Sequence, residues 1–175
     1  MRWLLTQAAV PFFPDGSLHE VVPEHVIAFT TWPGEGSEAA NFGLCRYPPE
    51  AVTDGGRRIE TGLPGWTWQS FCKTQYASSP DCGGVDHLLR CHLSVVDLLD
   101  AAAKPGLTLD VTDESGFYED RNVGELAAEV VCWNRGIAAF TGQLKDILGD
   151  GFAAEITKYP NFERLEAEGR LIQGE

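Results

Sequence analysis

The sequence predicts an α+β fold, with a mainly antiparallel sheet of four to six strands and two amphipathic helices packed on one face of it. Three observations predict this fold. The first half holds short segments rich in β-branched and aromatic residues, separated by turn residues. Apolar residues then recur at helical spacing over residues 85–104 and 123–148. Short loops between successive strands favour antiparallel pairing.

The strands come first along the chain. Four segments are expected to be strands, at residues 2–10, 26–32, 39–47 and 66–77. The last of them alternates in polarity, which predicts that one side faces the core. The side chains expected to face the core are Trp66, Trp68, Cys72 and Tyr76, and those expected to face outward are Gln69, Phe71, Lys73 and Gln75.

The first predicted helix covers residues 85–104 and stops at Pro105-Gly106. His92 falls on its apolar stripe, whereas His87 falls on the opposite face and is expected to meet solvent. A further strand is expected over residues 107–112.

The second predicted helix covers residues 123–148, where apolar residues alternate at spacings of three and four. Asn122 can cap it, with Glu125 completing a capping box. At 1.5 Å per residue this helix runs roughly 39 Å, longer than a small domain needs. Its length, with Gly136 and Gly142 on its flanks, favours a homodimer through residues 123–148 at least as much as a monomer. A short strand-like segment follows, and then a helical turn that Asn161 caps and Gly169 ends.

The composition predicts one globular domain over residues 1–175. Apolar residues make up 43% and charged residues 22% of the chain, which is ordinary for a folded protein. The formal charge of −13 repels nucleic acid and anionic lipid, and no basic stripe offsets it, so neither is expected as a partner.

The five cysteines are widely spaced and contain no Cys-x-x-Cys pair. This pattern favours free thiols in a reducing compartment. Thr6-Gln7 and Pro11 interrupt the apolar start of the chain, which argues against a signal peptide. We therefore expect a cytoplasmic protein that needs no membrane.

Motif searches predict neither a cofactor nor a metal ion. No phosphate-binding glycine loop, dinucleotide fingerprint or zinc-ligand repeat occurs. The acidic run at residues 110–120 fails the calcium-loop register, because its sixth position is Ser115 and its twelfth is Arg121.

A catalytic hypothesis rests on Cys72, His92 and Asp113, with the thiol as nucleophile, the imidazole as base and the carboxylate orienting the ring. Cys82, beside the start of the first helix, is an alternative nucleophile. The competing interpretation is a structural histidine. In that interpretation His92 bonds to Ser70, Thr74 or Tyr76.

A ligand-binding hypothesis rests on the outward face of the 66–77 segment, where Gln69, Lys73 and Gln75 would line a shallow site for a small anion or a peptide, with Arg46 beside them. The competing interpretation is an ordinary half-exposed sheet face. Because every catalytic motif is missing or misplaced, the leading hypothesis is an interaction or ligand-binding module. The alternative is a small acyl-transfer hydrolase that uses Cys72 or Cys82 with His92, and the sequence does not decide whether the chain is an enzyme.

Overall fold

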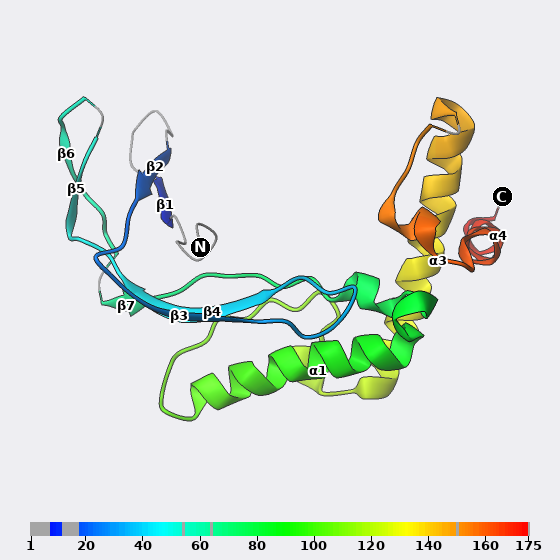
Figure 1. Ribbon diagram of the computed structural model, residues 1–175, viewed down its shortest axis with the longest axis horizontal. Helices are drawn as coiled ribbons and strands as arrows, with labels where there is room; N and C mark the ends of the chain where they lie inside the picture. The colour runs from blue at the N-terminus through cyan, green and yellow to red at the C-terminus, as the bar shows by residue number, and fades with distance from the viewer. Residues whose placement is uncertain (1–7, 12–17, 54, 64, 150, 175) are drawn as a thin grey trace. The chain divides into compact units, whose positions relative to one another are not determined.

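The structure is a computed structural model that describes residues 8–11, 18–53, 55–63, 65–149 and 151–174. The chain divides into two compact units, and each is described by itself. The first comprises Met1–Trp32 and Ala39–Cys72, and the second comprises Pro33–Glu38 and Lys73–Glu175. The chain contains helices and antiparallel sheets and is therefore α+β, as predicted (Figure 1). The single domain stays a prediction.

The first unit contains the described strands. Their bounds are β1 Ala8–Pro11, β2 Leu18–Val21, β3 His25–Thr31, β4 Ala40–Arg46, β5 Glu50–Val52, β6 Arg58–Glu60 and β7 Trp66–Thr67. All pairings between them are antiparallel, and they form sheets of two, three and two strands in the orders β1-β2, β3-β4-β7 and β5-β6. The predicted strands at 26–32 and 39–47 are confirmed as β3 and β4. Of the predicted strand at 2–10, residues 2–7 lie outside the described part of the chain.

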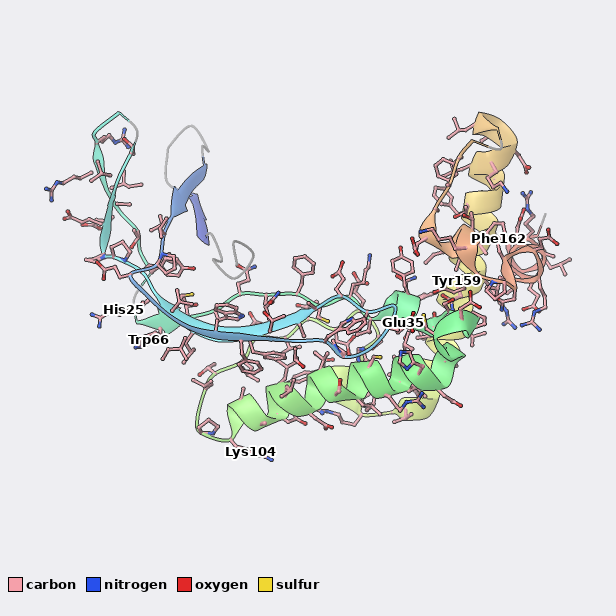
Figure 2. All side chains as sticks on the ribbon, in the orientation of Figure 1. His25, Glu35, Trp66, Lys104, Tyr159 and Phe162 are labelled. Carbon is pink, nitrogen blue, oxygen red and sulfur yellow. The ribbon has the colours of Figure 1, made fainter. Side chains whose placement is uncertain are left out.

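The β3-β4 pair is the longest ladder of the first unit. Phe29 and Phe42 lie opposite each other with ring centroids 5.6 Å apart. At one end of this sheet, where His25 and Trp66 both pair with Arg46, the ring of His25 lies 6.3 Å from that of Trp66 (Figure 2). The core of this unit consists of Val21, Cys45 and Tyr47 with partly buried neighbours.

The described strands do not form the single sheet of four to six strands that the sequence predicted. Pro48 and Pro49 follow β4, and proline has no N–H group with which to continue a ladder. Both prolines instead accept hydrogen bonds from Thr61, which closes β5 and β6 into a separate hairpin. The packing of two helices on one face of a sheet stays a prediction.

The predicted strand at 66–77 is wrong after Thr67. Only Trp66 and Thr67 pair with β4, and the indole N–H of Trp68 donates to the backbone oxygen of Asn41, 3.0 Å away. The chain turns into a short 3-10 helix at Gln75.

The second unit contains the helices (Figure 1). Their bounds are η2 Gln75–Ser78, η3 Pro80–Cys82, α1 Gly84–Ala103, α2 Phe117–Asp120, α3 Val123–Leu148, η4 Glu155–Lys158 and α4 Phe162–Gln173. The predicted helices at 85–104 and 123–148 are confirmed as α1 and α3. The predicted strand at 107–112 is wrong, because those residues form no ladder. The strand-like segment before α4 is the 3-10 helix η4.

The start of α3 follows its sequence signal. The side-chain oxygen of Asn122 accepts hydrogen bonds from the backbone N–H groups of Gly124 and Glu125, at 3.1 and 3.2 Å. These bonds satisfy two of the donors that a helix leaves open at its N-terminus.

The buried face of α3 changes along its length. Leu126 and Val130 pack against α1 and α2, as the apolar stripe predicts. Further along, Phe140 and Ile147 of the same stripe are 57% and 77% exposed. The helix instead turns a face of small residues toward η4 and α4, where a second core forms around Ala138, Ile156, Tyr159, Phe162 and Leu165.

Candidate functional site

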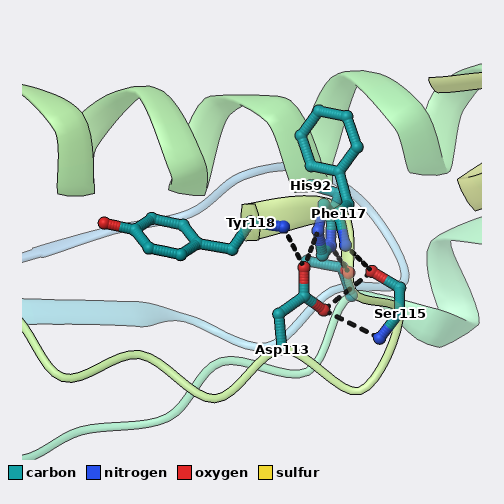
Figure 3. Close-up of polar contacts among 6 residues, drawn as sticks. His92, Asp113, Ser115, Phe117 and Tyr118 are labelled. Atoms are coloured by element: carbon teal, nitrogen blue, oxygen red, sulfur yellow. Dashed lines mark hydrogen bonds and ion pairs between the residues drawn. The ribbon is translucent and has the colours of Figure 1, made fainter. Parts of the chain in front are cut away.

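The second unit contains three polar arrangements that bear on function, and His92 and Asp113 form the first. Nε2 of His92 lies 3.2 Å from Oδ2 of Asp113 (Figure 3). An ionised carboxylate only accepts hydrogen bonds, so Nε2 carries a proton and donates it to this bond. In the neutral ring Nδ1 then accepts from the hydroxyl of Thr74, 3.3 Å away. The edge of the imidazole also packs on Phe117, at 5.6 Å between centroids.

Asp113 accepts several hydrogen bonds from the turn that leads into α2. Its Oδ1 accepts from the backbone N–H and the hydroxyl of Ser115, at 3.0 and 2.7 Å, and its Oδ2 also accepts from the N–H of Tyr118 at 3.0 Å (Figure 3). Burial alone raises the pKa of Asp113. The bonds from Ser115, the positive charge of His92 in its protonated form and the bond from Tyr118 outweigh burial, so the pKa of Asp113 lies below the ordinary value. The carboxylate is therefore held ionised.

This geometry matches the structural interpretation of His92 most closely. Thr74 is one of the three partners that this interpretation named, and it is only 8% exposed, so substrate has little access to its hydroxyl. Asp113 does contact the ring, as the catalytic hypothesis required. Cys72 belongs to the first unit and His92 to the second. The catalytic role of Cys72 with His92 and Asp113 stays a prediction.

The residues of the predicted ligand site are divided between the units. Arg46 ends β4 and Gln69 follows β7 in the first unit, whereas Lys73 and Gln75 belong to the second. They share no strand face, because β7 ends at Thr67. Their role in binding a ligand stays a prediction.

A second polar arrangement joins α1 to the segment Pro33–Glu38. Nε2 of His87 lies 3.0 Å from the backbone oxygen of Glu35, and the thiol of Cys91 donates to the backbone oxygen of Pro33 at 3.5 Å. Gly34 lies directly over both side chains, since a Cβ there would stand 2.7 Å from Sγ of Cys91. His87 is therefore half-buried rather than fully exposed to solvent, because a segment from elsewhere in the sequence contacts its ring.

Cys91 and Cys82 both carry thiols that favour the protonated form. Burial raises the pKa of Cys91, which is fully buried. Burial also raises the pKa of Cys82, and the carboxylates of Glu35 and Asp81 raise it further. The helix N-terminus beside Cys82 therefore does not make it a reactive thiol.

The third arrangement is a pocket of about 230 Å³ among η2, α1, α3 and α4. Its lining residues are Ser78, Pro80, Gly84, Val85, Val131, Asn134, Arg135, Tyr159, Asn161, Arg164, Leu165 and Glu168. Tyr159 lies just ahead of α4 (Figure 2). Neither the catalytic nor the ligand-binding hypothesis drawn from the sequence included any of these residues.

Hydrogen bonds at the back of the pocket fix the orientation of Asn134. Its Nδ2 donates to Oγ of Ser78 at 2.9 Å, and the Ser78 hydroxyl donates to the backbone oxygen of Gln75 at 2.7 Å. The reverse orientation would set Oδ1 of Asn134 against a hydroxyl oxygen whose single proton is already used. Asn134 is 6% exposed, and no donor among the described residues reaches its Oδ1.

Asn161 presents a second amide oxygen of the same kind. It occupies the N-cap position of α4, where asparagine usually bonds to the backbone of the first turn, yet its side chain makes no capping bond. Its Oδ1 is buried and lacks a donor within the described ranges. Asn134 and Asn161 are both among the residues that line the pocket, but their Oδ1 atoms are closed to solvent.

Three charged side chains also line the pocket. Nε of Arg135 lies 2.7 Å from Oε2 of Glu168, and Nε of Arg164 lies 3.7 Å from its Oε1. Two cations share one carboxylate, so this group carries a net charge of +1, from two positive charges and one negative charge. A locally positive site on a chain of net charge −13 is distinctive.

One sequence signal could have indicated this pocket. Asn134 lies four residues after the buried Val130 and four before the buried Ala138, so it falls on the apolar side of α3. A polar residue at such a position must find a partner or a ligand. Asn161 gave no comparable signal, because asparagine before a helix is typical of a cap.

Comparison with protein-family models, with curated proteins and with solved structures finds no match for this chain. None of the helices in the described residues combines the length and the apolar character that a membrane crossing requires. Across the same residues, no three His, Cys, Asp or Glu side chains group as ligands for a metal ion.

Proposed function

We propose that the protein is a ligand-binding module rather than an enzyme, and that the pocket lined by Asn134 and Asn161 is its binding site. The two arginines at the pocket, Arg135 and Arg164, support this proposal most directly, because Glu168 balances only one of their charges.

The side chains of the pocket suit binding better than catalysis. Burial raises the pKa of Tyr159 and keeps its phenol protonated, although its hydrogen bond with Ser78 acts in the opposite direction. The proton of Ser78 is committed to a backbone oxygen, and the carboxylate of Glu168 is paired with Arg135. The pocket therefore offers hydrogen bonds and charge without an activated nucleophile.

The proposal is tested by blocking the pocket. A panel of small polar compounds is titrated into the ¹⁵N-labelled protein, and we expect at least one compound to shift the side-chain amide signals of Asn134 and Asn161. Val131→Phe fills the pocket and should abolish those shifts, whereas Val123→Phe, at an exposed position of the same helix, should leave them intact. Shifts that persist in a folded Val131→Phe protein, or no shifts from any compound, would refute the proposal.

The second candidate function is the small hydrolase that uses Cys72 or Cys82 with His92. The observation that favours it is the contact between His92 and Asp113, which resembles the way a carboxylate orients a catalytic imidazole. Three features weigh against it. Both ring nitrogens are already bonded, the neighbouring Thr74 hydroxyl is buried, and the pKa of Cys82 is raised.

We also propose that the protein self-associates through the C-terminal end of α3. Several exposed apolar side chains lie in this part of α3 and on α4, namely Phe140, Ile147, Leu148, Leu171 and Ile172. Exposed apolar surface of this kind is typical of interaction sites. The five cysteines, none of them in a disulfide, are consistent with the cytoplasm, which we propose as the compartment.

A further inference from the structure

We infer that the outer edge of β3 is an interface at which two copies of this chain pair as antiparallel strands. This edge belongs to the first unit, whereas the pocket and the exposed apolar residues of α3 and α4 belong to the second. The β3 interface therefore adds to the proposed function and does not depend on it.

The strand β3 lies at the edge of its sheet. The strand order is β3-β4-β7, so β3 has a neighbouring strand on one side only. Among the described residues, no segment other than β4 makes a backbone hydrogen bond with residues 25–31. The outer edge of such a strand presents a row of N–H and C=O groups that can pair with another chain. Five of its seven side chains are exposed, including Ile27 at 66% and Phe29 at 53%.

This edge also lacks the features that usually keep an exposed strand from pairing. Natural sheets protect their edges with lysine and other charged residues, with proline, with bulges or by keeping the edge strand short. Residues 25–31 contain no Lys, Arg, Asp, Glu or Pro, and they pair with β4 without interruption over all seven positions. The edge of β3 is therefore suited to the addition of another strand to the sheet.

The distribution of charge favours a second copy of the chain as the source of that strand. A basic partner, which the net charge of −13 would attract, finds no carboxylate on β3 or β4, because residues 25–32 and 39–46 contain no Asp or Glu. Two copies of so acidic a chain repel each other wherever their carboxylates meet. At the edge of β3 they can approach without opposing like charges.

Two copies of β3 are also complementary to each other in the register centred on Ala28. In an antiparallel pair related by a two-fold axis, this register pairs all seven residues and places Ile27 opposite Phe29 of the second copy. Within each copy, Ile27 pairs with Leu44 and Phe29 pairs with Phe42. One row of apolar side chains would thus continue from the sheet of one copy into the sheet of the other. Cross-strand pairs of this kind stabilise a sheet.

Sedimentation equilibrium of Ile147→Glu tests this pairing without the contact proposed at α3. We expect a single chain at micromolar concentration and dimers as the concentration rises toward about 1 mM, because a strand edge is a small interface. Higher salt should strengthen the association, since salt screens the repulsion between two acidic chains. Wild type should form particles larger than two chains at these concentrations, because two different two-fold interfaces join dimers into longer assemblies.

A charge on the edge tests which strand is involved. Ile27→Lys, added to Ile147→Glu, should weaken the association about tenfold or more, because lysine is one of the residues that protect natural edges. Val52→Lys, added to the same protein, is the matched control, since it places the same charge on a 64% exposed residue of β5. This control should associate as Ile147→Glu does.

A cross-link tests the register in the wild-type background. Directly opposed residues of an antiparallel pair have Cα atoms about 4.5 to 5.5 Å apart, which a disulfide can span. Ala28→Cys, which lies opposite itself in the second copy, should therefore give a disulfide-linked dimer when copper(II) phenanthroline accepts the two electrons from the pair of thiols. Thr30→Cys, which lies opposite Val26, should give far less. Both variants retain the native cysteines, so these cannot cause the difference.

The results either support the β3 interface or overturn it. It is wrong if Ile147→Glu stays a single chain at every concentration, or if Ile27→Lys and Val52→Lys associate alike. It is also wrong if Ile27→Lys lowers the urea midpoint more than Val52→Lys does, because Ile27 would then be covered within its own chain. Equal cross-linking of Ala28→Cys and Thr30→Cys would overturn the register. If Ile147→Glu associates as wild type does and Ile27→Lys prevents it, the α3 contact is wrong and the β3 interface stands.

Discussion

Nε2 of His92 lies 3.2 Å from Oδ2 of Asp113, and the two side chains are 17% and 11% exposed. This contact joins α1 to the turn before α2, across 21 residues of sequence. Because Asp113 also accepts bonds from Ser115 and Tyr118, it organises the local fold whether or not His92 has a chemical role.

The first prediction concerns Asp113. Its folded-state pKa lies below the unfolded value, so the ionised carboxylate contributes stability above the unfolded pKa of about 3.9, and that contribution is lost as the pH falls through the folded pKa. Asp113→Asn should therefore lower the free energy of unfolding by about 1 to 3 kcal/mol at about pH 7. Urea denaturation at decreasing pH should show the difference from wild type shrinking below about pH 4. Asp110→Asn, which alters an exposed carboxylate nearby, is the control and should have little effect. A difference between Asp113→Asn and wild type that does not change with pH would contradict this explanation.

The second prediction separates the two interpretations of His92. His92→Ala should lower the free energy of unfolding by about 1 to 3 kcal/mol, because Thr74 and Asp113 lose a partner. Arg90→Ala, at an exposed position on the same helix, should stay within about 0.5 kcal/mol of wild type. Denaturant midpoints measure both changes. A His92→Ala protein at least as stable as wild type would favour the enzyme, since active sites carry strain.

The third prediction compares two glycines within helices. Gly136→Ala should stabilise the protein by about 1 kcal/mol, because a Cβ there meets nothing within 4 Å and alanine has the higher helix propensity. Gly169→Ala should instead destabilise it, because its Cβ would stand 2.9 Å from Cβ of Ala139 and from the carbonyl carbon of Arg135. Thermal unfolding of the two variants should give shifts of opposite sign. Shifts of the same sign would mean that α3 and α4 do not pack this closely.

The fourth prediction concerns the thiols. Burial raises the pKa of Cys82 and of Cys91, so neither should react with iodoacetamide at about pH 6 faster than an unstructured cysteine. Cys91 should be protected until the protein unfolds, because it is fully buried. Mass spectrometry of digested samples assigns the labelled sites. Rapid labelling of Cys72 or Cys82 would favour the hydrolase over the ligand-binding module as the function of this protein.

The fifth prediction concerns self-association. Light scattering at micromolar concentration should give a particle of about twice the chain mass of 19.1 kDa. Ile147→Glu should reduce it to one chain, because this apolar side chain is 77% exposed near the C-terminal end of α3. Val52→Glu, which alters a 64% exposed residue of β5, is the control and should leave the dimer intact. A wild-type particle of 19.1 kDa would exclude the dimer under these conditions.

Sequence patterns predicted the long helices because their signals are local. Asn122 caps α3, and Leu126 and Val130 pack where the apolar stripe places them. Beyond that point the periodicity failed to show which face is buried. Phe140 is exposed because α4 packs on a face of small residues, and small residues carry little apolar signal.

The remaining errors have one physical cause, which is that partners distant in sequence decide the outcome. The alternation over residues 66–77 suits a strand, but β4 pairs with only two of those residues. His87 lies on the polar side of α1 in sequence, but Glu35 and Gly34 cover it. The pocket likewise brings Ser78 to Asn134 and Tyr159, which are 56 and 81 residues away. Periodicity could single out Asn134 as a polar residue on an apolar face, but it could not have predicted these partners.

The second unit is discontinuous in sequence, since Pro33–Glu38 contributes to it and the next contributing residue is Lys73. The bond from Cys91 to Pro33 closes a separation of 58 residues. Contacts between residues this far apart in sequence slow folding, because chain entropy must be lost before they form. A fragment that starts at Lys73 would leave the thiol of Cys91 and the ring of His87 without the backbone oxygens that they contact. The second unit can therefore be studied in isolation only if Pro33–Glu38 is grafted onto it.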